Sequence, residues 1–220
     1  MIPYVNIHTH RPEYQNIELI DLATKNDWEP RWCYSFGLHP WNIATTDLEN
    51  YLEQIATLIN EKKIMAIGEA GVDRVIQTEV ELQKQVFNEQ VLLSEQFQMP
   101  IIIHCVKAWA DLSEIRKQTK AKTPWIYHGF TANLHTAQQI RLEGNYLSFG
   151  KALLINPKVQ AVFASYPIEK IFLETDDSDE KIETIYEKAA DLRHISMAEL
   201  KEAIYGNFIT VFGESYSNIG

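Results

Sequence analysis

The amino-acid sequence predicts an α/β fold of the (β/α)8, TIM-barrel-like class. Short apolar runs of strand length alternate with amphipathic helical patterns, and this alternation is typical of parallel βαβ units. Eight such runs occur, which is the number of strands in this barrel. The runs are VNIH (5–8), IELIDL (17–22), CYSFG (33–37), MAIGE (65–69), IIIH (101–104), WIYH (125–128), YLSFG (146–150) and IFLET (171–175). An open, doubly wound sheet is the alternative fold for the same alternation.

The chain is short for this barrel. It has 220 residues, whereas the usual size is about 250 and the lower limit about 200. The missing length falls between the second and third strand candidates. There the segment ATKNDWEPRW (23–32) is barely long enough for a crossover, which needs about 10–12 residues with its helix. We therefore expect the barrel to be distorted or incomplete near its N-terminal third.

Helical periodicity fills most connections between the strand candidates. In DLENYLEQIATLINE (47–61), Leu48, Leu52, Ile55 and Ile59 recur at the spacing of one helix face. Similar patterns predict helices over 78–96, 111–117, 134–143, 158–165, 180–192 and 197–211.

Two helix ends carry capping signals. Gly144 is predicted at the C-terminal cap of the 134–143 helix. Asp177 is predicted to cap the 180–192 helix, with Glu180 three residues later as in a capping box.

The composition is that of an ordinary soluble globular chain, with 45% hydrophobic and 23% charged residues. The apolar runs are too short to span a membrane, and the N-terminus lacks the pattern of a signal peptide. Cys33 and Cys105 lie far apart and outside any paired zinc-type spacing. With no repeat or Gly/Ser linker, we expect one domain over 1–220, located in the cytoplasm, without a membrane or an obligate protein partner.

The net charge limits the possible partners. A protein that coats duplex nucleic acid usually has a basic face, because phosphate neutralisation dominates its affinity. The net charge of −10 therefore argues against a large non-specific DNA footprint. It leaves room for an enzyme that binds a few phosphates through a metal ion.

Histidines and carboxylates gather where the strand candidates end. His8 and His10 stand one residue apart, so an extended chain would point both imidazoles to the same side. His39, His104 and His128 also end or follow a strand candidate or its loop. Glu69 closes MAIGE and Asp176 follows IFLET. In this barrel the C-terminal strand ends share one mouth, so we expect these side chains to converge. The remaining histidines, His135 and His194, fall in helical patterns and are predicted on the surface.

Each of these residues has a simpler explanation when taken alone, as a core histidine or a carboxylate at a helix N-terminus. Six donors at strand ends together favour a metal site, since buried carboxylates and imidazoles are costly without partners. A catalytic zinc uses about three protein ligands, so six donors fit two ions better. Two ions about 3.5–4 Å apart can hold both oxygens of a phosphoryl displacement, with Glu69 as candidate bridge. The donor types suit zinc, manganese, iron or nickel better than magnesium. The six candidate ligands are His8, His10, Glu69, His104, His128 and Asp176.

Seven motifs in order along nearly the whole chain resemble those of the TatD family of metal-dependent hydrolases, within the amidohydrolase-like barrels. They are HTH (8–10), GLHPW (37–41), AIGEAGVD (66–73), PIIIH (100–104), HGF (128–130), LETD (173–176) and GNFITVF (206–212). The resemblance implies a TIM-barrel-like fold and a deoxyribonuclease that depends on Mg²⁺ or another divalent metal. Several members of the family are 3′→5′ exonucleases.

The resemblance also assigns roles by position. The ligands of one ion match His8, His10, Glu69 and Asp176, and those of the second match Glu69, His104 and His128, with Glu69 bridging. His39 matches a position near the substrate phosphate. Asp176 is expected to orient or deprotonate the attacking water as well, so that Glu69 and Asp176 are the catalytic residues.

This chain departs from the family pattern at several positions. Asn6 stands where an Asp usually precedes HxH, and HCV (104–106) replaces HSR, which removes an Arg expected to contact phosphate. We expect Lys107 or Trp109 to substitute for it, Trp109 by stacking on a base; packing is the other explanation for Trp109. HGFTA replaces HCFSG, TDDS replaces TDAP, and the span from HTH to GLHP is shorter than usual.

The sequence thus predicts a divalent-metal-dependent phosphodiesterase, a 3′→5′ exonuclease-like deoxyribonuclease that acts on DNA ends. The alternative is a barrel hydrolase of small molecules, such as an amide, a lactone or a phosphate ester. A non-catalytic binding protein that keeps the metal ligands is a third reading. The presence of Asp176 argues against that reading, because a pure binding protein has no need for a carboxylate that orients water.

Overall fold

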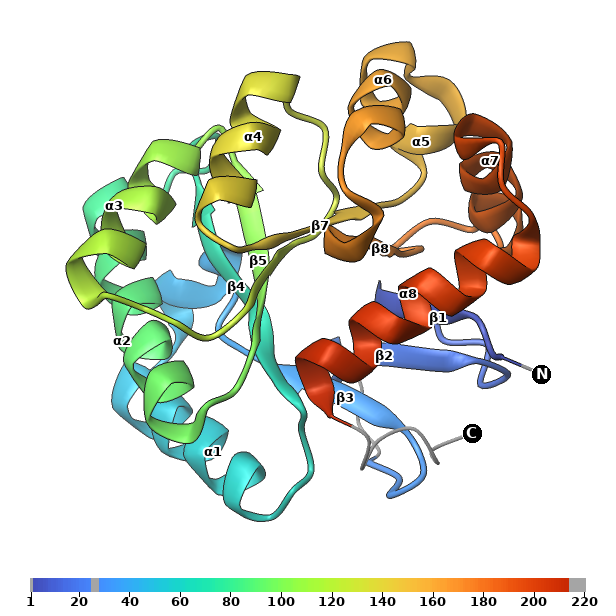
Figure 1. Ribbon diagram of the computed structural model, residues 1–220. Coiled ribbons are helices and arrows are strands. Elements are labelled where there is room, and N and C mark those ends of the chain that lie inside the picture. The colour runs from blue at the N-terminus through green and yellow to red at the C-terminus, as the bar shows by residue number, and fades with distance from the viewer. Residues whose placement is uncertain (1, 25–27, 214–220) are drawn as a thin grey trace. The chain divides into compact units, whose positions relative to one another are not determined.

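The computed structural model describes residues 2–24 and 28–213 (Figure 1). Within these residues the strands are β1 (Val5–Thr9), β2 (Ile17–Asp21), β3 (Cys33–Phe36), β4 (Ala66–Asp73), β5 (Ile101–Val106), β6 (Trp125–Tyr127), β7 (Tyr146–Phe149) and β8 (Ile171–Leu173). The α-helices are α1 (Leu48–Asn60), α2 (Val80–Phe97), α3 (Trp109–Thr119), α4 (Leu134–Leu142), α5 (Ala152–Ile155), α6 (Pro157–Ser165), α7 (Ile182–Arg193) and α8 (Met197–Phe212). Three 3-10 segments are η1 (Leu22–Thr24), η2 (Pro40–Thr45) and η3 (Ile168–Lys170).

The strand order in the sheet follows the chain from β1 to β8. Every neighbouring pair with a described register is parallel. This is the strand order of the (β/α)8 class, and it excludes a doubly wound sheet, whose order reverses at a switch point. The strands are buried along nearly their whole length, as expected of parallel strands covered on both faces.

No helix among the described residues is both long and apolar enough to cross a membrane.

The first third is irregular, as predicted. Within residues 2–24 and 28–47, helical structure is limited to the 3-10 segments η1 and η2. The register between β1 and β2 also shifts between Asn6 and Thr9. Residues 25–27 of the short 23–32 segment lie outside the described residues.

The chain divides into two compact units. Unit 1 comprises 1–20, 29–33 and 126–220, and unit 2 comprises 21–28 and 34–125. In unit 1, α8 lies beside α7, β1 and β8 (Figure 1). The buried Tyr186 of α7 ties to β1, because its hydroxyl bonds the backbone N–H and C=O of Val5, each at 3.0 Å. The prediction of a single domain stays a prediction.

In unit 2, α2 packs against β4, α3 packs against β4 and β5, and α1 packs against α2 (Figure 1). Two buried glutamines of α2 bind the backbone at strand ends. Gln90 bonds the N–H and C=O of Leu38 at 2.7 and 3.1 Å. Gln83 does the same for Asp73 at 2.7 and 3.0 Å. These side chains fix the loop that precedes His39 and the end of β4.

Several predicted strand ends were wrong. The IFLET strand was expected to reach Thr175, but β8 ends at Leu173. Glu69 does not close its strand, because β4 continues to Asp73 and pairs with β5 over residues 70–73. The register shifts between Ile67 and Ala70, so Glu69 sits at a bulge, a feature that re-aims a side chain. His104 likewise lies inside β5, which ends at Val106.

The helix boundaries hold to within a few residues, with two exceptions. Asp177 does not cap a helix: α7 begins at Ile182, and the turn before it bonds internally, with the Glu180 N–H donating to the Ser178 hydroxyl at 3.1 Å. The short α5 was missed because four apolar residues carry no helical period. Gly144 was predicted at the C-cap of α4, but the C-cap is Glu143, and Gly144 follows it with a φ of 81°. His135 and His194 are exposed, as predicted.

Candidate metal sites

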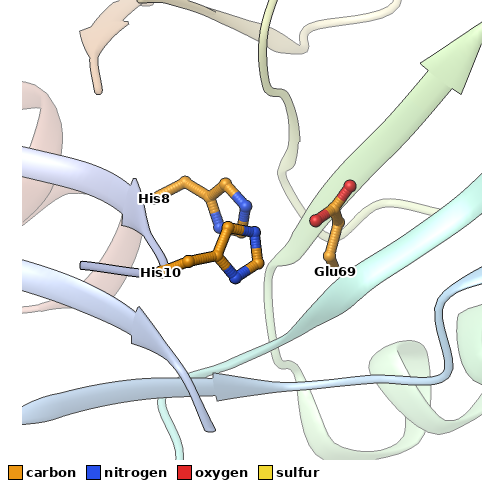
Figure 2. Close-up of side chains that lie close together, drawn as sticks. All are labelled: His8, His10 and Glu69. Carbon is orange, nitrogen blue, oxygen red and sulfur yellow. The ribbon is translucent and has the colours of Figure 1, made fainter. Parts of the chain in front are cut away.

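Unit 1 holds one group of potential ligands, in which His8, His128 and Asp176 present donor atoms within 4.8 Å of one another. Asp176 Oδ1 lies 3.6 Å from His8 Nε2 and 3.4 Å from His10 Nε2. The rings of His8 and His128 are 4.6 Å apart between centroids. Figure 2 shows His8 and His10 with their imidazoles next to each other at the end of β1. The alternation of a strand therefore places both rings on one side, as the sequence indicates.

Main-chain hydrogen bonds hold Asp176 against β1. Its N–H donates to the carbonyl of His8, and its own carbonyl accepts from the N–H of His10, both at 3.0 Å. Asp176 has a φ of 55°, in the left-handed region that Asp adopts more readily than most residues. The backbone that carries this carboxylate is thus fixed by hydrogen bonds at both its N–H and its C=O.

The side chain of Asn6 links β1 to Thr175 by hydrogen bonds next to this ligand group. Its Oδ1 accepts the N–H of Thr175 at 2.9 Å, and its Nδ2 donates to the Thr175 hydroxyl at 2.8 Å. That hydroxyl then donates to Thr9 at 3.0 Å. An Asp at position 6 could only accept, so the Thr175 proton would be needed for two acceptors. The asparagine therefore matches its surroundings in this chain.

His128 and the turn after β6 are held by the buried carboxylate of Glu174. The Gly129 N–H donates to Glu174 Oε1 at 2.5 Å, and His128 Nδ1 lies 3.6 Å from the same oxygen. Gly150 lacks a side chain where an added Cβ would meet Glu174 at 3.2 Å. Sequence reasoning missed Glu174, although it belongs to the LETD motif.

Unit 2 holds a second group, formed by His39, Glu69 and His104. Glu69 Oε1 lies 2.5 Å from His104 Nδ1 and 3.2 Å from His39 Nε2, and these two nitrogens are 3.2 Å apart. Figure 2 shows the Glu69 side chain as it leaves β4. Glu69 and His104 are buried. Three donors that face one another so closely can share one cation.

Asp73 supports His104 from its other side. His104 Nε2 lies 3.3 Å from Asp73 Oδ2, which also accepts the indole N–H of Trp41 at 2.9 Å. Burial raises the pKa of Asp73, but hydrogen bonds from Trp41, Val75 and His104 outweigh it and hold the pKa below its ordinary value. A carboxylate behind a ligating imidazole fixes the ring and its tautomer. Sequence reasoning missed Asp73, although it closes the AIGEAGVD motif.

Gly71 brings the two strands of this group together. An added Cβ there would lie 1.9 Å from the backbone oxygen of His104. Only glycine allows β4 to approach β5 so closely beside the ligands. This contact explains the second glycine of AIGEAGVD.

The sequence model of the family described as "TatD related DNase" matches residues 4–213. The chain belongs to this family. YcfH of Escherichia coli K12, named an uncharacterized metal-dependent hydrolase, is 25% identical, and the alignment covers 94% of this chain and 81% of that protein. YabD of Bacillus subtilis 168, named likewise, is 32% identical over 64% of this chain and 57% of that protein.

One relative in the TatD family is named for a substrate. The protein of Schizosaccharomyces pombe called deoxyribonuclease Tat-D is 26% identical, and the alignment covers 72% of this chain but 54% of that protein. This chain is a metal-dependent hydrolase of the TatD family, and its substrate is a separate question.

Solved TatD structures confirm the fold. The crystal structure of the TatD homologue YjjV from E. coli K12 superposes with a TM-score of 0.76 at 24% identity, over 87% of this chain and 80% of that one. A TatD family hydrolase from Entamoeba histolytica gives 0.74 at 23% identity, over 82% and 74%.

The donor chemistry of both groups fits the divalent metal of the TatD family. Each group combines imidazole nitrogens with a carboxylate oxygen, a set that suits zinc, manganese, iron or nickel. His39 lies among the potential ligands of unit 2, although the sequence predicts it only near the substrate phosphate. Lys107 and Trp109 belong to neither group: Lys107 is exposed after β5, and Trp109 starts α3 half-buried.

Proposed function

We propose that this chain is a metal-dependent phosphodiesterase that shortens DNA from its ends, in the manner of a 3′→5′ exonuclease. The observation that carries the proposal is the presence, in each unit, of a compact group that mixes carboxylate and imidazole donors. The name of the S. pombe relative, deoxyribonuclease Tat-D, supports the same substrate class.

We assign the ligands as the TatD resemblance implies. Two divalent ions would be held by the six residues His8, His10, Glu69, His104, His128 and Asp176, with Glu69 assigned as a ligand of both. The ions, when bound, lower the pKa of a water molecule and neutralise negative charge on the phosphate. His39, Lys107 and Trp109 are the proposed contacts to the substrate.

Asp176 is the proposed acceptor of the proton from the attacking water. Its side chain is 36% exposed, so water reaches it, whereas Glu69 is buried. Its backbone bonds to residues 8 and 10 keep the carboxylate aimed. A general base of this kind contributes about 10²–10⁴-fold to the rate.

The test is degradation of a 5′-labelled single-stranded oligonucleotide by apo protein and by protein with Mg²⁺, Mn²⁺ or Zn²⁺. We expect a metal-dependent ladder of shortened products that Asp176→Asn loses by about 10²-fold or more. Asp177→Asn is the matched control: it makes the same charge change at the next, exposed residue, and it should keep the activity. Folded, metal-loaded protein that leaves the oligonucleotide intact would contradict the proposal.

A small-molecule hydrolase is the second candidate. Two observations favour it: the net charge of −10 and the HCV sequence that replaces an expected phosphate-binding Arg. The same metal-loaded protein, tested on aryl esters, amides and phosphate monoesters, decides between the two. The cytoplasmic location and the independence from a protein partner remain predictions from the sequence.

A further inference from the structure

Trp41 is an exposed aromatic residue directly beside the ligand group of unit 2. It follows His39 and Pro40 in η2, and 66% of its surface is exposed. Tryptophan is on average highly buried, because its large apolar ring gains more from burial than most side chains. The chain nevertheless holds this ring in water next to His39, Glu69 and His104.

The indole of Trp41 is held in one orientation. Its Nε1–H donates to the buried carboxylate of Asp73 at 2.9 Å, and its backbone N–H donates to His39 Nδ1 at 3.2 Å. The ring meets His39 edge-on, with centroids 5.1 Å apart at 89°, and lies 6.3 Å from the ring of His104. An exposed ring that is fixed in this way needs little further ordering when it binds a flat partner.

Asp73 therefore connects two functions. One carboxylate oxygen contacts both the imidazole of His104 and the indole of Trp41. The buried side chain of Asp73 therefore fixes the position of the indole relative to His104, and with it the position of any substrate group that stacks on the indole.

We propose that Trp41 is a substrate-binding residue whose exposed indole stacks on a nucleobase of the nucleotide whose phosphate lies at His39, Glu69 and His104. The proposal rests on the proposed nuclease function. Aromatic stacking accepts any base, because every base has a flat π-face. It supplies affinity without positive charge, which suits a chain with a net charge of −10.

Trp109 is the competing residue for this role in unit 2. It begins α3 and is half-buried, whereas 66% of the surface of Trp41 is exposed. Trp28 offers a matched control, since it is 36% exposed and its indole N–H donates to the Lys63 carbonyl at 3.1 Å. It belongs to none of the ligand groups of the described residues.

The first experiment compares cleavage kinetics of wild type, Trp41→Leu, Trp41→Phe, Trp109→Leu and Trp28→Leu. Each is tested on an oligonucleotide and on the same strand with an abasic 3′-terminal nucleotide. We expect Trp41→Leu to raise KM for the base-bearing strand by about 5- to 150-fold, and to leave KM for the abasic strand nearly unchanged. Trp41→Phe keeps a stacking ring but loses the bond to Asp73, and it should retain most of the affinity.

The same variants separate stacking from a structural role. If Trp41→Phe loses as much as Trp41→Leu, or if both substrates lose equally, the indole acts only by holding Asp73, and the stacking proposal is wrong. A loss in Trp109→Leu with an unchanged Trp41→Leu would assign the role to Trp109 instead. Trp28→Leu should match wild type.

A second measurement does not depend on catalysis. Titration with deoxyadenosine 5′-monophosphate should quench the tryptophan fluorescence of the metal-loaded protein, and deoxyribose 5-phosphate should not. The quenching should disappear in Trp41→Phe, which removes the indole proposed to stack on the base. Quenching that persists there would overturn the proposal. If wild type binds the nucleotide in this way but cleaves no oligonucleotide, the nuclease function fails while Trp41 stacking stands.

Discussion

The two ligand groups differ in how the chain holds them. In unit 1, Asp176 is fixed by two main-chain hydrogen bonds to residues 8 and 10. In unit 2, His104 lies between two carboxylates, and the outer one, Asp73, is in turn held by Trp41 and Gln83. Main-chain bonds thus fix Asp176, although the side chain of Glu174 holds the turn that carries His128. The group of unit 2 is held by successive side-chain contacts.

This difference has a consequence for mutation. Main-chain bonds survive most side-chain substitutions. A relay of side-chain contacts, such as Glu69–His104–Asp73–Trp41 in unit 2, is broken when any member is replaced. Unit 1 should therefore be sensitive chiefly at its ligands. Unit 2 should also be sensitive at residues that touch no ion.

The largest effect is expected from the double variant His8→Ala, His10→Ala. It removes two assigned ligands, so the metal affinity of the folded protein should fall by more than about 100-fold. That factor is the upper range for mutation of residues that only hydrogen-bond to a ligand. Metal content after dialysis, read alongside circular dichroism, is the measurement. The matched control is His135→Ala, His194→Ala, which removes two exposed histidines. Equal metal content in both double variants would show that residues 8 and 10 are not ligands.

Glycine replacements compare the packing around the two groups. Gly71→Ala in unit 2 would place a Cβ 1.9 Å from the His104 backbone, so we expect a loss of about 3 kcal/mol or more in the free energy of unfolding. Gly129→Ala in unit 1 has a nearest atom at 3.7 Å and a φ of 55°. We expect Gly129→Ala to lower the free energy of unfolding by only about 1–2 kcal/mol, the cost of the left-handed conformation for a residue with a Cβ. Urea denaturation of both variants measures the difference, and similar costs would contradict it.

The relay itself is tested by Asp73→Asn. The amide can still accept from Trp41 but no longer offers a charged partner to His104, so metal affinity should fall by about 10- to 100-fold in folded protein. In unit 1, Asn6→Ala breaks the link to Thr175 but spares the main-chain bonds of Asp176, and it should weaken metal binding by a smaller factor. Calorimetric titration with Zn²⁺ ranks the two. A larger loss in Asn6→Ala would reverse the comparison.

The sequence predicts these sites unevenly, for physical reasons. Strands and helices follow from local apolar periodicity, and the TatD motifs place His8 and His128 at strand ends. The role of Asp73 depends on β4 continuing past Glu69, which is decided by pairing with β5 rather than by local residues. The approach of His39 to Glu69 is likewise a contact between distant segments. The link through Asn6 became visible only with its partner Thr175, 169 positions away.

The smallest effects concern pH and should have opposite signs in the two units. Burial raises the pKa of Glu18 in unit 1, although backbone N–H groups of residues 13 and 14 lower it in part. Its contribution to stability is therefore complete below the ordinary Glu value of about 4.3 and is lost as pH rises through the folded pKa. In unit 2, the bidentate bond from Arg74 lowers the pKa of Asp111. That contribution is present above the ordinary Asp value of about 3.9 and is lost as pH falls through the folded pKa.

Denaturation midpoints from about pH 2 to 7, that is from about two units below to about three units above these ordinary values, measure both slopes. Glu18→Gln should reduce the loss of stability that occurs as pH rises. Asp111→Asn should reduce the loss of stability that occurs as pH falls. The two variants share a change of one charge, so a general charge effect would shift both profiles in the same direction. Profiles that shift together would mean that net charge governs the pH dependence. Opposite changes would show that burial dominates at Glu18 and that the Arg74 pair dominates at Asp111.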